Sequence, residues 1–234
     1  MAEQLVFELG REEPPSFDNF IAGANAEVVA ALRRFARDPI DRGLVLWGAP
    51  STGKTHLLRA SVAEAQARGR EAVFFEAPSM LPRDPPTPAA MIAVDAVDTA
   101  TASEQGALFT LYNAALAQGG QMLWGSPLPP ARLALREDLR TRIGHGLVFE
   151  VLALGDADLP HALRIYAEER GFPLAPEVIA YLLRHRRRDL RSLTNLVASL
   201  DRHSLATRRA ITVSLVKAWL DGASAETSTP TDGG

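Results

Sequence analysis

The chain has 234 residues, a formal net charge of −3 and 47% apolar residues, a balance typical of a globular protein with one core domain and a smaller appendage. It contains no cysteine, which excludes disulfides, thiolate metal sites and cysteine nucleophiles. No apolar run approaches the roughly 18 residues of a spanning helix, and no signal peptide is apparent. We therefore expect a cytoplasmic protein that binds no membrane. The slightly negative net charge argues against a protein that coats nucleic acid without sequence preference.

The first part of the chain alternates predicted helices and strands. Apolar residues recur at helical spacing over 25–37, 54–68 and 104–118. Short apolar runs predict five strands, at Leu44–Trp47, Ala72–Phe75, Met91–Val94, Met122–Trp124 and Leu147–Phe149. Because these strands alternate with helices, we predict an α/β fold with a mostly parallel five-stranded sheet covered on both faces.

After residue 151 the pattern becomes helical throughout. Helical periodicity covers four stretches with no strand candidate between them: 156–169, 176–185, 190–202 and 212–220. The last stretch of the chain has no apolar residue beyond alanine, so we expect it to be disordered. The sequence thus predicts four parts: an arm over 1–15, a core over 16–153, a small all-helical lid over 154–222 and a tail over 223–234.

A phosphate-binding motif lies between the first predicted strand and the next helix. Residues 48–55, GAPSTGKT, match GxxxxGK[ST]. In this motif the glycines let backbone amides turn around phosphates, Lys54 reaches the terminal phosphates, and Thr55 offers its hydroxyl to magnesium. We therefore predict a site for ADP or ATP with Mg²⁺, formed by Gly48, Ser51, Thr52, Gly53, Lys54, Thr55 and His56.

The magnesium shell of such a site also needs an acid at the end of a neighbouring strand. Asp95 directly follows the strand predicted over 91–94, and it is the candidate. Together with Thr55 it would hold Mg²⁺ through water.

Several sequence boxes, in the right order, resemble the AAA+ module of the bacterial replication initiator DnaA, and more closely its short relatives, the Hda regulators that inactivate DnaA. The resemblance covers about 16–222. Residues 16–25, SFDNFIAGAN, resemble the box that holds adenine in this family, which implies that Phe20 binds nucleotide. Residues 109–113 resemble the family's FxLYN segment, 121–130 its sensor strand, and 211–220 its closing ITxxxVxxxL helix. The resemblance implies an AAA+ core followed by a helical lid.

Two arginines acquire roles from this resemblance. Residues 139–143, LRTRI, resemble the segment that carries the arginine finger, which implies that Arg142 completes the active site of a neighbouring molecule; Arg140 is the alternative. Arg191 resembles the sensor 2 arginine that reaches from the lid to the nucleotide. The basic run 184–188 leaves three interpretations open: a solvated helix end, a partner surface or a nucleic-acid patch.

The N-terminal arm resembles the QLxLxL peptide by which Hda and other replication proteins dock on the DNA polymerase sliding clamp. Its docking residues would be Gln4, Leu5, Phe7 and Leu9. The glutamine amide would hydrogen-bond the pocket rim while the apolar side chains fill the pocket. The alternative is a strand that packs on its own domain.

The sequence also departs from the family pattern. Position 96 is alanine, where AAA+ ATPases normally have a second acid that polarises the attacking water. Asp98 is an alternative, but it lies two residues further on, beyond the strand end. Gly125, Ser126 and Pro127 stand where the initiator has a T-S-D sensor triplet. We therefore expect weak intrinsic hydrolysis, with the nucleotide serving as a structural ligand.

The resemblance implies a regulator that docks on the sliding clamp and stimulates ATP hydrolysis by DnaA. The sequence ends after the lid helices without the initiator's duplex-DNA-binding domain, so we expect DNA contact only through the clamp, with homo-oligomers possible. One alternative is a helicase loader or another AAA+ ATPase that hydrolyses its own ATP. A small-molecule P-loop kinase is disfavoured, because it would need an acceptor pocket and a phosphate lid within the sheet domain.

Overall fold

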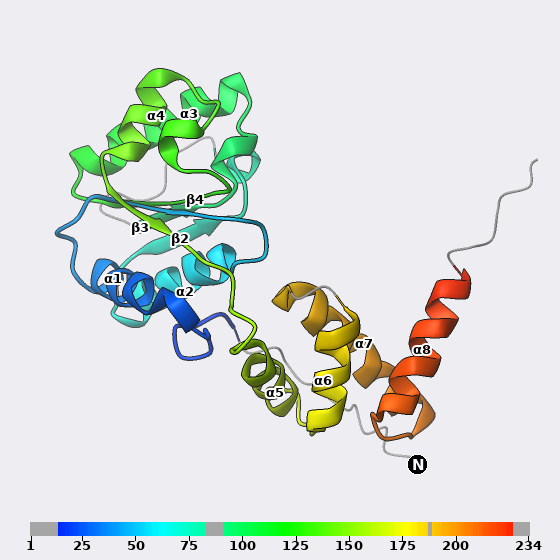
Figure 1. Ribbon diagram of the computed structural model, residues 1–234. Coiled ribbons are helices and arrows are strands. Elements are labelled where there is room, and N and C mark those ends of the chain that lie inside the picture. The colour runs from blue at the N-terminus through cyan, green and yellow to red at the C-terminus, as the bar shows by residue number, and fades with distance from the viewer. Residues whose placement is uncertain (1–13, 83–90, 187–188, 227–234) are drawn as a thin grey trace, which may run out of the picture. The chain divides into compact units, whose positions relative to one another are not determined.

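The computed structural model describes residues 14–82, 91–186 and 189–226 (Figure 1). Contacts divide the chain into two compact units, a core over 14–154 and a helical unit that starts at Gly155. This division lies one residue from the predicted boundary between 153 and 154. The arm residues 1–13 lie outside the described residues.

Five parallel strands form the sheet of the core, as predicted. They are β1 (Gly43–Trp47), β2 (Ala72–Phe75), β3 (Met91–Val94), β4 (Gln121–Ser126) and β5 (Leu147–Glu150). Their order is β2-β3-β4-β1-β5, and each neighbouring pair is parallel. The segments that follow β1 and β3 therefore leave the sheet at the same edge, where ligands of open α/β sheets bind.

Helices cover both faces of this sheet (Figure 1). On one face lie α1 (Ala26–Arg37) and α2 (Lys54–Ala67), and on the other lie α3 (Ala102–Ala117) and α4 (Glu137–Gly144). Successive residues of β1 alternate between the two layers, because side chains of a strand point to opposite faces: Leu44 and Leu46 pack with α1 and α2, and Val45 packs with α3. A sheet buried on both faces explains why the strands are almost entirely apolar.

Short 3₁₀ helices occur in the connections of the core. They are η1 (Gly23–Asn25), η2 (Pro78–Met80), η3 (Val97–Thr99) and η4 (Pro130–Arg132). Of these, η3 follows the strand-end residue Asp95, and η4 precedes α4.

Helix α4 was not predicted. It spans only eight residues, of which Leu139 and Ile143 are buried, and its N-cap, Arg136, makes no side-chain cap hydrogen bond. Two apolar residues at helical spacing are too few to distinguish a helix from a loop.

The helical unit consists of α5 (Leu159–Glu169), α6 (Pro176–His185), α7 (Leu190–Thr207) and α8 (Val213–Glu226). Buried aliphatic side chains from all four helices form its core: Leu163, Val178, Leu182, Val197, Leu200 and Val216. Helix α7 ends five residues later than predicted, and α8 includes four residues that the sequence assigned to the tail. Within the described ranges, no helix has the length and apolar character needed to cross a membrane.

Candidate functional site

The loop between β1 and α2, residues 48–53, forms a cradle with unusual backbone angles. Gly48, Ser51 and Gly53 have φ values of +152°, +64° and +96°. A Cβ atom at Gly48 would overlap the carbonyl oxygen of Val151, and one at Gly53 would lie 2.7 Å from the ring of Phe20. Gly53 is also the N-cap of α2 and has no side chain to cap it, so the first amides of α2 can bind an anion.

The Lys54 ammonium lies inside this loop. Its Nζ donates hydrogen bonds to the carbonyl oxygens of Gly48 at 2.7 Å and Ala49 at 2.8 Å. Burial lowers the pKa of Lys54, whereas the charges of Asp95 and Asp98 raise it. Phosphate oxygens could take the place of these two carbonyl acceptors, and their negative charge would favour the protonated amine.

Thr55 and Asp95 meet at the edge of the sheet. The Thr55 hydroxyl donates to Asp95 Oδ2 at 2.5 Å, and the amide of Ala96 donates to Oδ1 at 2.8 Å. A Cβ atom at Gly125, in β4, would overlap the Asp95 carboxylate and approach the Leu58 side chain. Glycine at this position therefore allows the Asp95 carboxylate to pack against β4.

This pair fits magnesium carried by a nucleotide. The described residues contain no cluster of three or more histidine, cysteine, aspartate or glutamate side chains that could hold a metal ion alone. Mg²⁺ in nucleotide sites is usually bound through one or two protein oxygens, with phosphates and waters as its other ligands. A hydroxyl and a carboxylate beside a phosphate cradle match that donor set.

Phe20 and His56 lie together beside the cradle. Their ring centroids are 5.4 Å apart, and His56 Nε2 lies 2.8 Å from the carbonyl oxygen of Ser16. Because a carbonyl accepts, Nε2 carries the proton. Reciprocal hydrogen bonds between Ser16 and Asn19, at 2.9 Å and 3.2 Å, form a turn that precedes Phe20. His56 thus attaches the segment 16–20 to helix α2.

The buried side chain of Asn25 forms a second attachment, which was not predicted. Its Nδ2 donates to the carbonyl oxygen of Leu152 at 2.9 Å, and its Oδ1 accepts from the Leu152 amide at 2.8 Å. These bonds link the start of α1 to the segment after β5. The only sequence signal was the position of Asn25 at the end of the 16–25 box.

Burial of His56 predicts a pH effect on stability. Burial lowers the pKa of His56 from its ordinary 6.5, although the Ser16 hydrogen bond partly offsets this effect. As the pH falls below 6.5, the unfolded chain binds this proton before the folded chain does. The free energy of unfolding should therefore decrease between pH 6.5 and the lower folded-state pKa. Urea unfolding measures this pH-dependent decrease in the free energy of unfolding. The decrease should be smaller in His56→Gln than in the control His145→Gln, which replaces an exposed histidine. Equal decreases in the two variants would contradict the prediction.

The residue after Asp95 is alanine, so it carries no carboxylate. Ala96 adopts a left-handed conformation, with φ of +49°, and η3 follows it with an exposed Asp98. The Ser126 hydroxyl, at the end of β4, donates to the carbonyl oxygen of Leu128 at 2.7 Å. Asp98 is the nearest alternative acid in sequence.

Arg142 lies away from this cradle, on α4. Its guanidinium carbon lies 4.6 Å from the ring centre of Phe109 and 5.7 Å from that of Tyr112. Burial raises the pKa of Tyr112, and the positive charge of Arg142 partly offsets this. Within the described ranges, no hydrogen bond, ion pair or ring contact joins Arg142 to residues 48–56.

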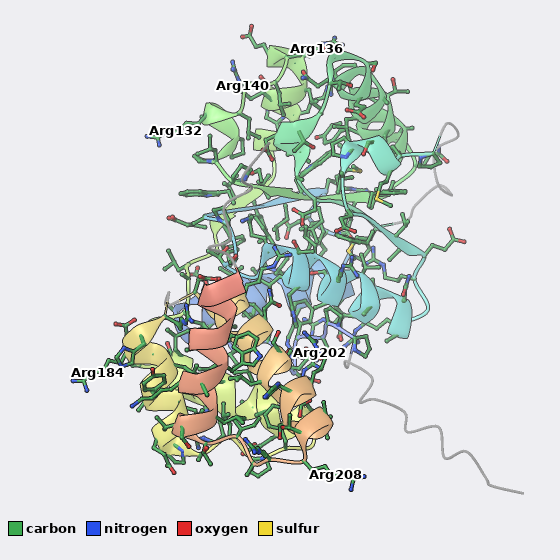
Figure 2. All side chains as sticks on the ribbon, turned by 90° about the vertical axis from the view of Figure 1, so that its right-hand side faces the viewer. Arg132, Arg136, Arg140, Arg184, Arg202 and Arg208 are labelled. Atoms are coloured by element: carbon green, nitrogen blue, oxygen red, sulfur yellow. The ribbon has the colours of Figure 1, made fainter. Side chains whose placement is uncertain are left out.

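An open groove of about 720 Å³ runs along the surface of α4. It is lined by Arg136, Glu137, Asp138, Thr141, Arg142 and His145. Figure 2 shows Arg132, Arg136 and Arg140 projecting outward from η4 and α4. Arg136 forms an ion pair with Asp138 at 2.7 Å. The surface around Arg142 is thus rich in guanidinium groups.

The remaining predicted site residues belong to the helical unit or to the arm. Arg191 is exposed near the start of α7, in the helical unit, where Asp189 caps the helix by accepting from the Ser192 amide at 2.8 Å. The structure therefore brings Phe20, the cradle residues, His56 and Asp95 together, and it places Arg142 and Arg191 on other elements. Four predicted docking residues lie outside the described residues: Gln4, Leu5, Phe7 and Leu9.

The fold is similar to that of several solved AAA+ proteins. Domain III of the Thermotoga maritima replication initiation protein DnaA matches with a TM-score of 0.78 and 19% identity, over 90% of this chain and 97% of that one. AMPPCP-bound DnaA from Aquifex aeolicus matches with a TM-score of 0.66 and 19% identity, over 81% of this chain and 65% of that one. The Thermotoga maritima RuvB Holliday junction branch migration motor matches with a TM-score of 0.67 and 16% identity, over 89% of this chain and 72% of that one.

The helical unit gives a more specific match. Residues 156–220 match the family described as Hda, lid domain. This segment comprises α5 to α7 and most of α8. Residues 156–220 are thus similar to the lid domain of Hda, and the five-stranded core with this helical unit has the fold of DnaA domain III.

Proposed function

We propose that this protein is a nucleotide-binding regulator that stimulates ATP hydrolysis by the replication initiator DnaA and docks on the DNA sliding clamp. It would thereby prevent renewed initiation of replication. The lid match supports a regulator of this type, and the DnaA-like core supports packing against a DnaA partner, because AAA+ modules commonly assemble with their own kind.

Nucleotide binding follows from the cradle. Lys54 and the uncapped amides of α2 would hold the phosphates, Thr55 and Asp95 the hydrated Mg²⁺, and Phe20 the base. Bound Mg²⁺ would neutralise phosphate charge. A DnaA of similar fold binds the ATP analogue AMPPCP, which supports ADP or ATP as the ligand.

The placement of Arg142 is the observation that carries the proposal. Its guanidinium lines an open groove and contacts nothing in the cradle of its own chain within the described residues. An arginine finger has this arrangement when it stabilises charge on a phosphoryl group held by a neighbour. Because the neighbour supplies its own water-activating acid, Ala96 does not impair this role.

The proposal is tested by following hydrolysis of labelled ATP on DnaA, with and without clamp loaded on DNA. At a given concentration the wild-type protein should stimulate hydrolysis more strongly when the clamp is present. Gln4→Ala/Phe7→Ala should need about tenfold more protein for the same rate, because docking raises local concentration. Arg11→Ala, in the same arm but outside the motif, is the matched control and should act like the wild type.

Three outcomes would contradict the proposal. Equal stimulation without clamp would exclude docking, and no stimulation at any concentration would exclude the regulator. Rapid turnover of ATP by the protein alone would instead support the helicase loader or motor, and Asp98→Asn would then show whether Asp98 supplies the missing acid.

A further inference from the structure

We infer that Phe109 and Tyr112 are positioning residues, which hold the Arg142 guanidinium in the orientation needed to reach the partner's nucleotide. This inference rests on the proposed function. It assigns the α3 aromatic pair a role beyond packing.

The two rings form one platform on α3. Phe109 and Tyr112 are three residues apart, so they lie on the same helix face. Tyr112 is 6% exposed and stacks on Trp124 of β4, with ring centroids 6.4 Å apart. The platform is therefore anchored to the central strand of the sheet.

Helix α4 is fixed relative to this platform. Leu139 and Ile143 are buried in the same apolar cluster as Tyr112 and Trp124. The buried side chain of Gln105, on α3, accepts a hydrogen bond from the backbone amide of Arg136 at 2.8 Å, and donates to the Ala100 carbonyl at 3.0 Å. The backbone that carries Arg142 thus has a defined position over the rings.

The guanidinium of Arg142 lies close to both rings. At 4.6 Å and 5.7 Å from the two ring centres, it lies within the range of cation–π attraction. In the described part of the chain its side chain forms no ion pair, whereas Arg136, at 6.0 Å from the Phe109 ring, is also held by Asp138. The aromatic faces therefore restrict Arg142 without neutralising its charge.

This restriction matters because a free arginine side chain must lose rotamer entropy when it enters a partner's site. A guanidinium that is already oriented loses less, and it remains available because its nitrogen–hydrogen groups are not committed to a carboxylate. Cation–π contacts of this kind change equilibria by about 3- to 30-fold, which sets the expected size of the effect.

The kinetic test compares aromatic with aliphatic variants in the DnaA hydrolysis assay. Phe109→Leu and Tyr112→Leu should lower the maximal stimulated rate about 3- to 30-fold and leave the half-saturating concentration within about twofold. Phe109→Tyr and Tyr112→Phe keep the ring face and should retain the wild-type rate. Phe109→Leu combined with Arg142→Ala should be no slower than Arg142→Ala alone.

A second readout does not depend on DnaA. Ring currents of Phe109 and Tyr112 should shift the side-chain NMR signals of Arg142 upfield in the isolated protein, and Phe109→Leu should reverse most of that shift. Thermal unfolding of each variant shows whether it folds; Phe109 is only half-buried, so its variants keep the test valid if Tyr112→Leu does not fold.

The outcomes separate this inference from the proposed function. If Arg142→Ala stimulates normally, the proposed function fails. If Arg142→Ala is inactive but Phe109→Leu keeps the full maximal rate, or its Arg142 signals do not move, positioning by the rings is overturned. Equal loss in the folded Phe109→Tyr and Tyr112→Phe variants would also overturn it, because the ring faces would then not be the cause.

Discussion

Replacement of Arg142 by alanine should reduce stimulated ATP hydrolysis on DnaA by about 10³-fold or more, which is the scale of an arginine finger. The guanidinium would stabilise negative charge that develops on the transferring phosphoryl group, and alanine leaves no cation in its place. Single-turnover hydrolysis of labelled ATP on DnaA, with clamp loaded on DNA, measures the effect. Binding to the clamp should be unchanged, because the substitution leaves the predicted docking residues 4–9 intact.

Two variants control this result. Arg140→Ala removes a guanidinium of the same helix that projects outward, and it should retain stimulation within about threefold if it is only a surface charge (Figure 2). Arg142→Lys keeps the charge but loses the planar fork, so it should restore only part of the rate. If Arg140→Ala is the inactive variant and Arg142→Ala the active one, the finger is Arg140.

Replacement of Lys54 by alanine should weaken binding of ADP·Mg²⁺ and ATP·Mg²⁺ by about 100-fold or more. Two hydrogen bonds from an ammonium to phosphate oxygens, each contributing about 1.5–3 kcal/mol, account for a loss of that size. Isothermal titration calorimetry measures it directly. The variant should also lose the rise in Tm that a bound nucleotide produces.

The chain offers a matched control, because its only other lysine is Lys217. That residue is exposed on α8, with its Nζ 5.5 Å from the centre of the Tyr181 ring. Lys217→Ala should keep nucleotide affinity within about twofold. If Lys54→Ala binds as tightly as the wild type, the loop 48–55 is not the phosphate site.

Much of the candidate nucleotide site could be predicted, because its signals are local in sequence. The pattern 48–55 specifies a loop and the start of a helix within eight residues, and Asp95 directly follows a strongly apolar strand. Parallel strands bring such positions to one edge of the sheet. The pairing of Thr55 with Asp95, 40 residues apart, followed from that rule.

Other interpretations changed once distant contacts were known. From the sequence, Gly125 was interpreted as the loss of a polar sensor side chain. In the structure no side chain fits at this position, because Asp95 and Leu58 occupy the space. The Asn25 hydrogen bonds to Leu152 join residues 127 positions apart, and no short pattern specifies such a partner. Helix α4 is too short for its periodicity to be recognised.

The sequence by itself determined the five strands, the phosphate loop, the helical lid and the absence of an acid at position 96, since each depends on residue types within a few positions of one another. Only the tertiary structure decided what surrounds Arg142. The segment 139–143 singles out Arg142 by resemblance, but it carries no signal of which side chains contact the guanidinium. Its environment arises because α3 and α4 pack on the same face of the sheet, which brings Phe109 and Tyr112 under the guanidinium from about 30 residues away in the chain.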